Sequence, residues 1–193
     1  MRQPESLRRP AGLPPGQHAV ERLPVIHVGE IPSFDAALWT LEVGGDVEAP
    51  ARLAWSELRE MEEVEVVAPM HGGTGWSRLE NHWRGVRFAE VARLVRPREG
   101  ARYVRFADGE IYDATLPLEL AVEADVLLAR MLDDRPLAPA HGGPLRLVVP
   151  SRYGWKSVKW VRAIEFLRED QPGFWEARGF HWNADPWREE RWA

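Results

Sequence analysis

Apolar and polar residues alternate along several short segments, which is the pattern of strands that bury one face. This alternation predicts strands over residues 38–43, 64–69, 101–106 and 157–167. A nearly continuous apolar run, bounded by glycines and a proline, predicts a fully buried strand over residues 145–150. The chain therefore carries enough strand signal for at least one sheet.

Helical spacing of apolar residues is clearest over residues 88–95, and we expect Pro97 to stop that helix. Shorter helices are predicted over residues 57–61, with Ser56 as the cap, and over residues 118–122. These helices interrupt the predicted strands rather than alternate with them regularly.

The segment 125–132 fits a strand or a helix, and its period does not decide between them. No internal repeat and no regular strand–helix–strand rhythm are present in the sequence. Short strands interrupted by short helices predict the α+β class, with a mixed sheet and short helices.

The two ends of the chain differ from its middle. Prolines and scattered charges over residues 1–24 predict an extended N-terminal arm, and residues 25–170 form the predicted domain. Residues 171–193 are an aromatic and charged tail. Rings at this density usually cap a core or contact a partner, so we expect the tail to pack on the domain.

Composition excludes several classes of protein. The net charge of -5 leaves no general basic footprint for nucleic acid. No apolar run approaches the roughly 18 residues that span a bilayer. Arg8 and Arg9 resemble the start of a twin-arginine signal, but no apolar region follows them, which predicts a cytoplasmic location. Without cysteine, the chain has no disulfide, zinc ribbon, thiol nucleophile or thiolate-held iron–sulfur cluster.

Two glycine-rich loops are the first candidates for chemistry. Residues 71–76 (HGGTGW) follow a predicted strand, and their glycines could expose backbone N–H groups to an anion, although the pattern alone favours a tight turn. His141 opens a second loop that ends at Arg146, next to the buried strand. An arginine there could clamp a phosphate or carboxylate bidentately, or it could pair with a surface carboxylate.

A third polar loop contains the only two lysines of the chain, Lys156 and Lys159, on either side of Ser157. Two cations and a hydroxyl suit an anionic ligand, while a solvated strand edge is the alternative. Taken together, the three loops predict a small, phosphate-bearing anionic ligand. No HExxH, Gly-Lys-Ser/Thr or GxSxG motif accompanies them.

The order of motifs along residues 12–192 resembles the sulfite oxidase-like, molybdopterin-binding oxidoreductases, and in particular their compact cytoplasmic bacterial members. The motifs that carry the resemblance are PPGQ, HxxTGWS, HGGPLRLVVP, YGWKSVKW and the tail PGFWEARGFH–DPWREER. The resemblance implies one mixed α+β domain that buries a molybdopterin and its phosphate in a cleft.

The resemblance also implies roles for residues of this chain. His141 and Arg146 hold the cofactor, and Ser157, Val158 and Lys159 bind its phosphate and pterin end. The other residues expected to contribute to the cofactor site are His27, His71, Thr74 and Asp108.

One departure from the family lies at the metal. Members of the family read HCxTGWS, and the cysteine thiolate ligates molybdenum, whereas this chain has Gly72 at that position. Glycine supplies no side-chain donor. Water could fill the open coordination position, or His71 could approach it. We expect Gly72→Cys to raise molybdenum retention or activity.

Three functions compete on these grounds. The first is a molybdopterin-dependent oxidoreductase that transfers oxygen atoms on a small oxyanion or sulfoxide. Its electrons would pass to a separate partner because the chain has no haem motif, and Tyr153 and Arg78 are its candidate catalytic residues. The second is a non-catalytic module that binds or carries the cofactor. The third is a structural protein that uses the aromatic tail as an interface.

Overall fold

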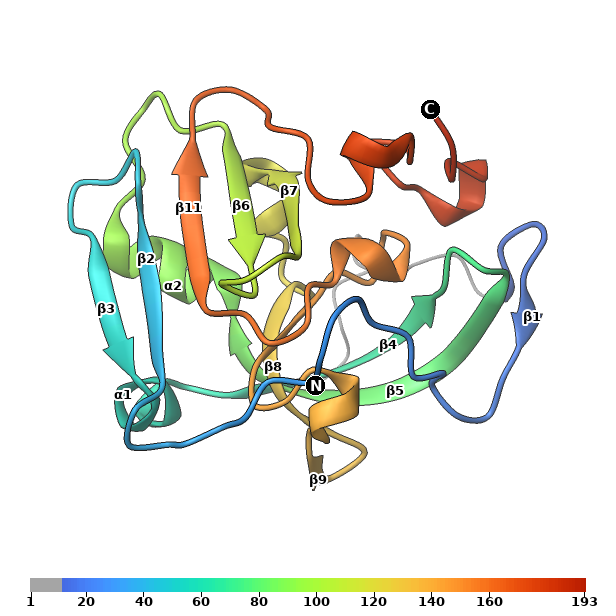
Figure 1. The fold of residues 1–193 in the computed structure, drawn as a ribbon, viewed down its shortest axis with the longest axis horizontal. Coiled ribbons are helices and arrows are strands. Elements are labelled where there is room, and N and C mark those ends of the chain that lie inside the picture. Colours follow the sequence, from blue (N-terminus) through green and yellow to red (C-terminus); the bar gives the residue numbers. More distant parts are fainter. Residues whose placement is uncertain (1–11) are drawn as a thin grey trace.

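The computed structural model describes residues 12–193, so the interpretation of Arg8 and Arg9 lies outside the described residues. Two sheets share the chain (Figure 1). In the five-stranded sheet the order is β3-β2-β11-β6-β7, and only the β2–β11 pair is parallel. Its strands are β2 (Thr40–Gly45), β3 (Ala51–Ala54), β6 (Tyr103–Ala107), β7 (Asp113–Pro117) and β11 (Ala163–Leu167).

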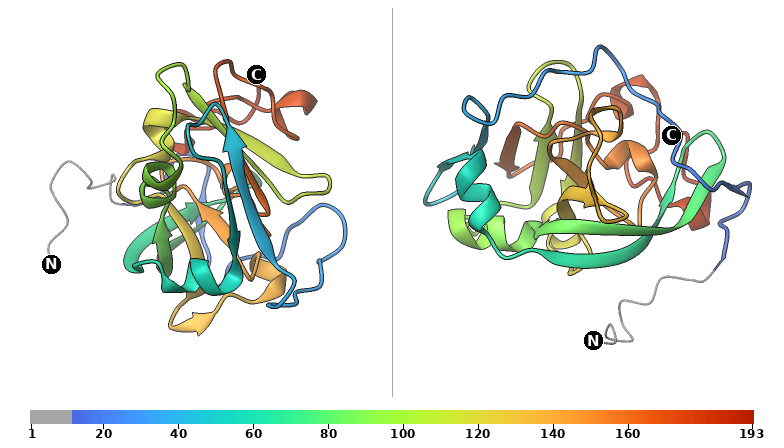
Figure 2. Two further views of the ribbon diagram at one scale, coloured as in Figure 1. Left: turned by 90° about the vertical axis from the view of Figure 1, so that its left-hand side faces the viewer. Right: turned by 90° about the horizontal axis from the view of Figure 1, so that it is seen from below.

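The second sheet follows the order β1-β5-β8-β10, with β4 paired to β5 and β9 paired to β8. Its strands are β1 (His18–Ala19), β4 (Val64–His71), β5 (Trp76–Arg87), β8 (Leu127–Leu132), β9 (Arg135–Pro136) and β10 (Arg146–Val148). The long β4–β5 hairpin runs along one side of the molecule, as Figure 2 shows from below. Because both sheets mix parallel and antiparallel pairs around short helices, the α+β fold class is confirmed.

Short helices connect the strands: α1 (Trp55–Glu60), α2 (Phe88–Val95) and α3 (Leu118–Ala121), together with 3₁₀ turns η2 (Pro139–His141), η3 (Gly154–Lys156), η4 (Glu176–Arg178) and η5 (Pro186–Arg188). Helix α2 buries Phe88, Val91, Ala92 and Val95 and has the bounds predicted for it. It ends because Arg96 adopts the left-handed conformation.

The main core lies where α2 meets both sheets. The ring of Phe88 packs against Phe106 of β6 at 5.0 Å and against Phe166 of β11 at 5.9 Å between ring centroids. The same cluster includes Leu128 of β8 and Leu147 of β10, which are fully buried. One continuous apolar core therefore fixes the two sheets relative to each other.

Several local predictions need correction. Ser56 lies inside α1, and Ala54 is the residue that precedes its first turn. The strand predicted over residues 157–167 is shorter, since only Ala163–Leu167 pair in the sheet and Gly154–Lys156 form a 3₁₀ turn. The undecided segment 125–132 contains strand β8.

Strand β5, the longest in the molecule, was not predicted, because its buried positions include the polar side chains of Ser77 and Asn81. A pattern of apolar residues cannot reveal a strand whose inward face is partly polar. Strand β7 was also missed. Its three central residues are all buried, so its short sequence does not show the alternation of apolar and polar residues that predicts a strand.

Both ends of the described chain return to the body. Strand β1 pairs in parallel with the start of β5, through His18 opposite Trp76. The tail packs through Phe180, whose ring meets that of Trp155 at 5.0 Å. The domain boundaries drawn from the sequence stay a prediction. No helix among residues 12–193 is long and apolar enough to cross a membrane.

Candidate functional site

A cavity of about 430 Å³ lies between the body of the protein and the segments near its two ends. Indole rings of Trp76, Trp155 and Trp160 line it from the body, and Trp175, Phe180 and Trp192 line it from the tail. The predicted site residues found in its lining are His27, Gly72, Thr74, Arg146, Ser157 and Lys159. A cavity of this size with aromatic walls and a few polar groups is typical of a site for a small molecule or cofactor.

Arg146 is the most deeply buried cation of the cavity. It begins β10, its Nη1 donates to the carbonyl of His141 at 2.9 Å, and its Nη2 lies 3.4 Å from the sulfur of Met70. Its Nε is buried with no hydrogen-bond partner in the described chain, and no Asp or Glu of residues 12–193 forms an ion pair with it. Burial lowers the pKa of Arg146 to about 10, so the guanidinium stays charged at neutral pH.

Lys159 and His141 lie beside Arg146. The ammonium of Lys159 donates to the carbonyl of Ala140 at 2.6 Å, and burial, aided by the charge of Arg146, lowers the pKa of Lys159 to about 7. Burial and the charges of Lys159 and Arg146 lower the pKa of His141, whose Nδ1 is buried without a partner in the described part of the chain. This concentration of positive charge, without a carboxylate to neutralise it, favours an anion in the cavity.

Ser157 and Val158 follow the turn η3. The hydroxyl of Ser157 accepts from the backbone N–H of Val149 at 3.0 Å, and the side chain lines the cavity. The side chain of Val158 is buried in the main core, and its carbonyl accepts from Leu147 N–H. Val158 therefore contributes main-chain geometry to this wall rather than a side chain.

The glycine-rich loop after β4 is a tight turn. Gly72 N–H donates to the carbonyl of Trp76 at 2.7 Å, and Gly75 N–H donates to the carbonyl of Gly72 at 3.2 Å. A Cβ at Gly72 would lie 2.1 Å from the indole of Trp76, and one at Gly73 would lie 2.8 Å from Trp155. The glycines are required because two indoles occupy the space that side chains would need.

His71, at the end of β4, is held by two residues that sequence reasoning missed. Its Nδ1 lies 2.7 Å from the hydroxyl of Ser77, which donates to Oε1 of Gln17 at 3.1 Å. Nε2 of Gln17 in turn donates to the carbonyl of Gly72 at 3.1 Å. Burial lowers the pKa of His71 to about 4, so the imidazole is neutral at physiological pH. The PPGQ motif was the one signal in the sequence that could have found Gln17.

Besides His71, His141 and Val158, three further predicted site residues lie outside the cavity lining. Asp108 accepts the N–H groups of residues 110–112 and thereby forms the turn after β6. Arg78 pairs with Asp133 at 2.6 Å and donates to Asn81. Tyr153 is fully buried, and its hydroxyl accepts from Nε of Arg191 at 3.1 Å. The catalytic roles of Arg78 and Tyr153 stay predictions.

The residues present fit one part of a molybdopterin better than the other. The unpartnered Nε of Arg146 and the ammonium of Lys159 suit the anionic phosphate end. Gly72 has no side-chain donor for a metal, and no group of three or more His, Cys, Asp or Glu side chains within residues 12–193 could hold one. The chain can thus hold the organic part of the cofactor, and the described residues supply no cluster of metal ligands.

Comparisons with known proteins agree with this geometry. Residues 28–175 match the family model described as the oxidoreductase molybdopterin binding domain. The chain is 40% identical over 180 residues to the oxidoreductase YuiH of Bacillus subtilis, an alignment that covers 93% of this chain and 91% of YuiH.

More distant relatives are larger proteins. The catalytic subunit MsrP of the protein-methionine-sulfoxide reductase of Xanthomonas axonopodis pv. citri is 32% identical, over 77% of this chain and 52% of that one. The sulfite oxidase of Arabidopsis thaliana is 29% identical, over 84% of this chain and 52% of the plant protein. The chain thus spans about half the length of these two enzymes.

Among solved structures, the sulfane dehydrogenase SoxCD of Paracoccus pantotrophus shares the fold, with a TM-score of 0.66 and 22% identity, over 72% of this chain and 40% of that one. The extent of the family match and the identity to YuiH settle the classification. The chain belongs to the molybdopterin-binding oxidoreductases, with a sulfite oxidase-like fold and molybdopterin as the family's cofactor.

Proposed function

We propose that this protein transfers oxygen atoms to or from a small oxyanion or sulfoxide and exchanges electrons with a separate protein partner. The observation that carries the proposal is the pair of cations in the cavity, Arg146 and Lys159, which have no carboxylate partner among the described residues. The names of its relatives support the substrate class, because they include a methionine-sulfoxide reductase, a sulfite oxidase and nitrate reductases.

In this proposal the chain's own residues hold the cofactor by its anionic end. Arg146 and Lys159 bind the phosphate, and Ser157, with its hydroxyl proton free to donate, completes that contact. His141 positions Arg146, because its backbone carbonyl accepts a hydrogen bond from Nη1 of Arg146. When bound, the cofactor's molybdenum supplies the two-electron redox centre.

The remaining predicted residues keep roles that experiment must test. His27 and Thr74 line the cavity, and His71 fixes the glycine turn through Ser77. Asp108 shapes the loop that carries Tyr112 into the lining. Tyr153 and Arg78 remain our candidates for residues that act on the substrate. A cytoplasmic location also remains part of the proposal.

The experiment is an activity assay on protein purified from a molybdenum-replete host. Reduction of a small sulfoxide with a reduced dye, and oxidation of sulfite with ferricyanide, test the two directions of oxygen transfer. Turnover of either substrate in proportion to molybdenum content would support the proposal. Protein that contains molybdenum and pterin yet turns over neither substrate would contradict it.

A second candidate function is that of a non-catalytic cofactor carrier. The observation that favours it is the indole of Trp76, which occupies the space where a side chain at Gly72 would project. A carrier would contain pterin without molybdenum, so the ratio of the two in the purified protein separates the candidates.

A further inference from the structure

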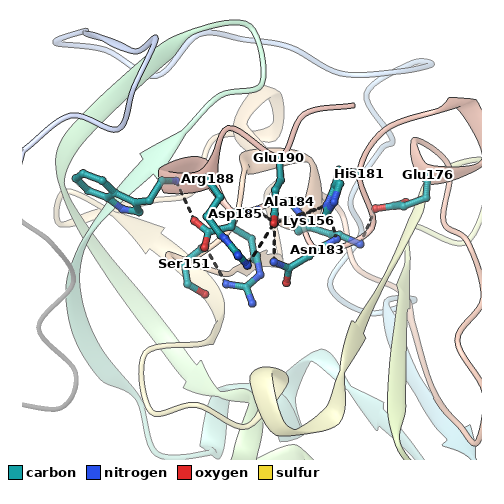
Figure 3. A network of polar contacts seen from close by, with 11 residues as sticks. Ser151, Lys156, Glu176, His181, Asn183, Ala184, Asp185, Arg188 and Glu190 are labelled. Atoms are coloured by element: carbon teal, nitrogen blue, oxygen red, sulfur yellow. Dashed lines mark hydrogen bonds and ion pairs between the residues drawn. The ribbon is translucent and has the colours of Figure 1, made fainter. Parts of the chain in front are cut away.

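A buried ion pair lies directly behind the cavity. The ammonium of Lys156 lies 2.5 Å from Oε1 of Glu176, and the two side chains are only 3% and 6% exposed. Lys156 also donates to the carbonyl of Thr115 on β7 at 2.9 Å. Figure 3 shows this pair at one end of a polar network that continues through the tail. Burying two opposite charges is expensive, so the pair is better explained by the geometry that it fixes than by stability.

The position of the pair connects two walls of the cavity. Lys156 lies between Trp155 and Ser157, which line the cavity from the body, and Glu176 follows Trp175, which lines it from the tail. The ion pair therefore connects the two walls, because each of its residues is a direct chain neighbour of a residue that lines the cavity. Burial lowers the pKa of Lys156, while Glu176 acts in the opposite direction.

Aromatic contacts extend this connection over the cavity. The ring of Phe180 meets Trp175 at 4.7 Å and Trp155 at 5.0 Å, and it also meets Trp192 at 4.5 Å. The ion pair fixes the backbone directly after Trp175, on which these rings rest. On the other side of Trp175, the N–H of Phe174 donates to the carbonyl of Asp113 at 3.2 Å, so the ion pair is the charged one of two contacts at the base of this aromatic wall.

The tail has other attachments that do not depend on the pair. Nε of Arg191 donates to the hydroxyl of Tyr153, and Tyr153 N–H donates to the carbonyl of Ala184 at 2.8 Å. Within the tail, Oε2 of Glu190 accepts from Asn183 and from the backbone of Asp185 (Figure 3). Removing both charges of the pair should therefore leave the tail attached and change the position of its first turn.

We propose that Lys156 and Glu176 are positioning residues for the cofactor cavity. Their ion pair holds Trp175 and Phe180 as the wall that retains the bound pterin. This inference rests on the proposed cofactor site, but it concerns retention of the ligand and not the reaction performed with it.

The test uses the double variant Lys156→Met/Glu176→Leu, because either single variant leaves an uncompensated buried charge and unfolds the protein too readily. The matched control is Arg52→Met/Glu42→Gln, which removes a pair of similar length (2.8 Å) that is 70% and 55% exposed. Two readouts are needed: the rate of pterin release from the holoprotein, and amide hydrogen exchange over residues 174–181 in cofactor-free protein.

We expect the double variant to release pterin about tenfold faster, corresponding to about 1.4 kcal/mol of lost retention. We also expect faster exchange over residues 174–181, with unchanged exchange in β6 and β11 and no change in the control. Release and exchange at the wild-type rates would overturn the inference. If the wild-type protein contains no pterin, the proposed function fails, and unchanged amide exchange would then overturn the positioning role separately.

Discussion

The main core around Phe88 and the cavity around Arg146 are both buried, yet they differ in how their groups are satisfied. Phe88 is enclosed by the rings of Phe106 and Phe166, and the buried side chains of its cluster carry no charge, although the indole N–H of Trp39 is buried there without a hydrogen-bond partner. In the cavity, Arg146 has a buried Nε without a partner in the described chain, and the nearby Lys159 adds a second cation. Single unpaired polar atoms also occur outside the cavity lining, such as Trp39 Nε1 and Thr115 Oγ1. Arg146 differs from them because a charged group that lines a cavity and lacks a carboxylate partner indicates where an anionic ligand completes the structure.

A substitution in the main core should change stability without changing cofactor binding. Phe88→Ala should lower the free energy of unfolding by about 3–5 kcal/mol, because it removes a ring from a site that cannot collapse. Urea denaturation measures the change. Pterin content per folded molecule should stay at the wild-type value, and its loss from correctly folded protein would contradict the separation of core and cavity.

Arg146→Met should have the opposite effect: it should weaken cofactor binding without lowering the stability of the protein. We expect retention of pterin to fall about a hundredfold, since a charge-assisted contact to the phosphate is lost, while the stability of the cofactor-free protein stays the same or rises. Pterin fluorescence after oxidation and urea denaturation measure the two quantities. Arg52→Met is the control, because Arg52 is exposed and lies on β3. Wild-type occupancy in Arg146→Met would contradict the assigned phosphate contact.

An added side chain should destabilise the protein more at Gly72 than at Gly44 in strand β2, where a Cβ meets no other atom within 4 Å. Gly72→Ala should destabilise the protein by about 1–3 kcal/mol, because the added carbon overlaps the indole of Trp76. Gly44→Ala is the matched control, since a Cβ there meets nothing within 4 Å. Thermal unfolding measures both variants, and equal stability of the two would show that Trp76 moves aside freely.

The same overlap sharpens the expectation for Gly72→Cys. A cysteine there brings the same Cβ against Trp76, so we expect a gain in molybdenum retention only when Trp76→Ala is combined with it. Metal analysis of the single and double variants measures this gain. Equal retention in the single variant would mean that the loop accepts a side chain without rearrangement.

The smallest predicted effect is a pH dependence. Burial lowers the pKa of Lys159 from 10.5 to about 7, so the folded protein releases a proton that the unfolded chain keeps. Stability of the cofactor-free protein should therefore rise as the pH increases from about 7 towards 10.5. Retention of an anionic ligand should weaken severalfold over the same step, because the cation is lost. Lys159→Met should remove the loss of retention and reduce the rise in stability, of which the remainder belongs to Lys156, whose pKa is also lowered by burial. A rise in stability as steep as that of the wild type would assign the trend to a group other than Lys159.

The sequence allowed the fold class and the cation-rich half of the site to be predicted. Helix α2 and strands β2, β4, β6, β10 and β11 follow from the apolar pattern, because each of them presents apolar side chains to a core. Strand β5 escaped prediction since Ser77 and Asn81 occupy buried positions on it. Arg146 and Lys159 were found because glycine-rich loops beside strands indicated them.

Contacts between distant segments could not be predicted in the same way. Gln17 reaches His71 through Ser77, and Glu176 reaches Lys156, although these partners are far apart in the chain. Such pairs depend on how the tail and the N-terminal segment fold back, which local periodicity does not encode. The overlap of Trp76 with a side chain at Gly72 likewise depends on a ring orientation that only the structure gives.

The most direct test of the account is the pterin and molybdenum content of the protein, purified from a molybdenum-replete host that makes the cofactor. The account predicts pterin close to equimolar with protein in the wild type and its loss in Arg146→Met. Wild-type protein without pterin, from a host whose own molybdenum enzymes contain the cofactor under the same conditions, would contradict the central claim that the cavity around Arg146 and Lys159 binds this cofactor.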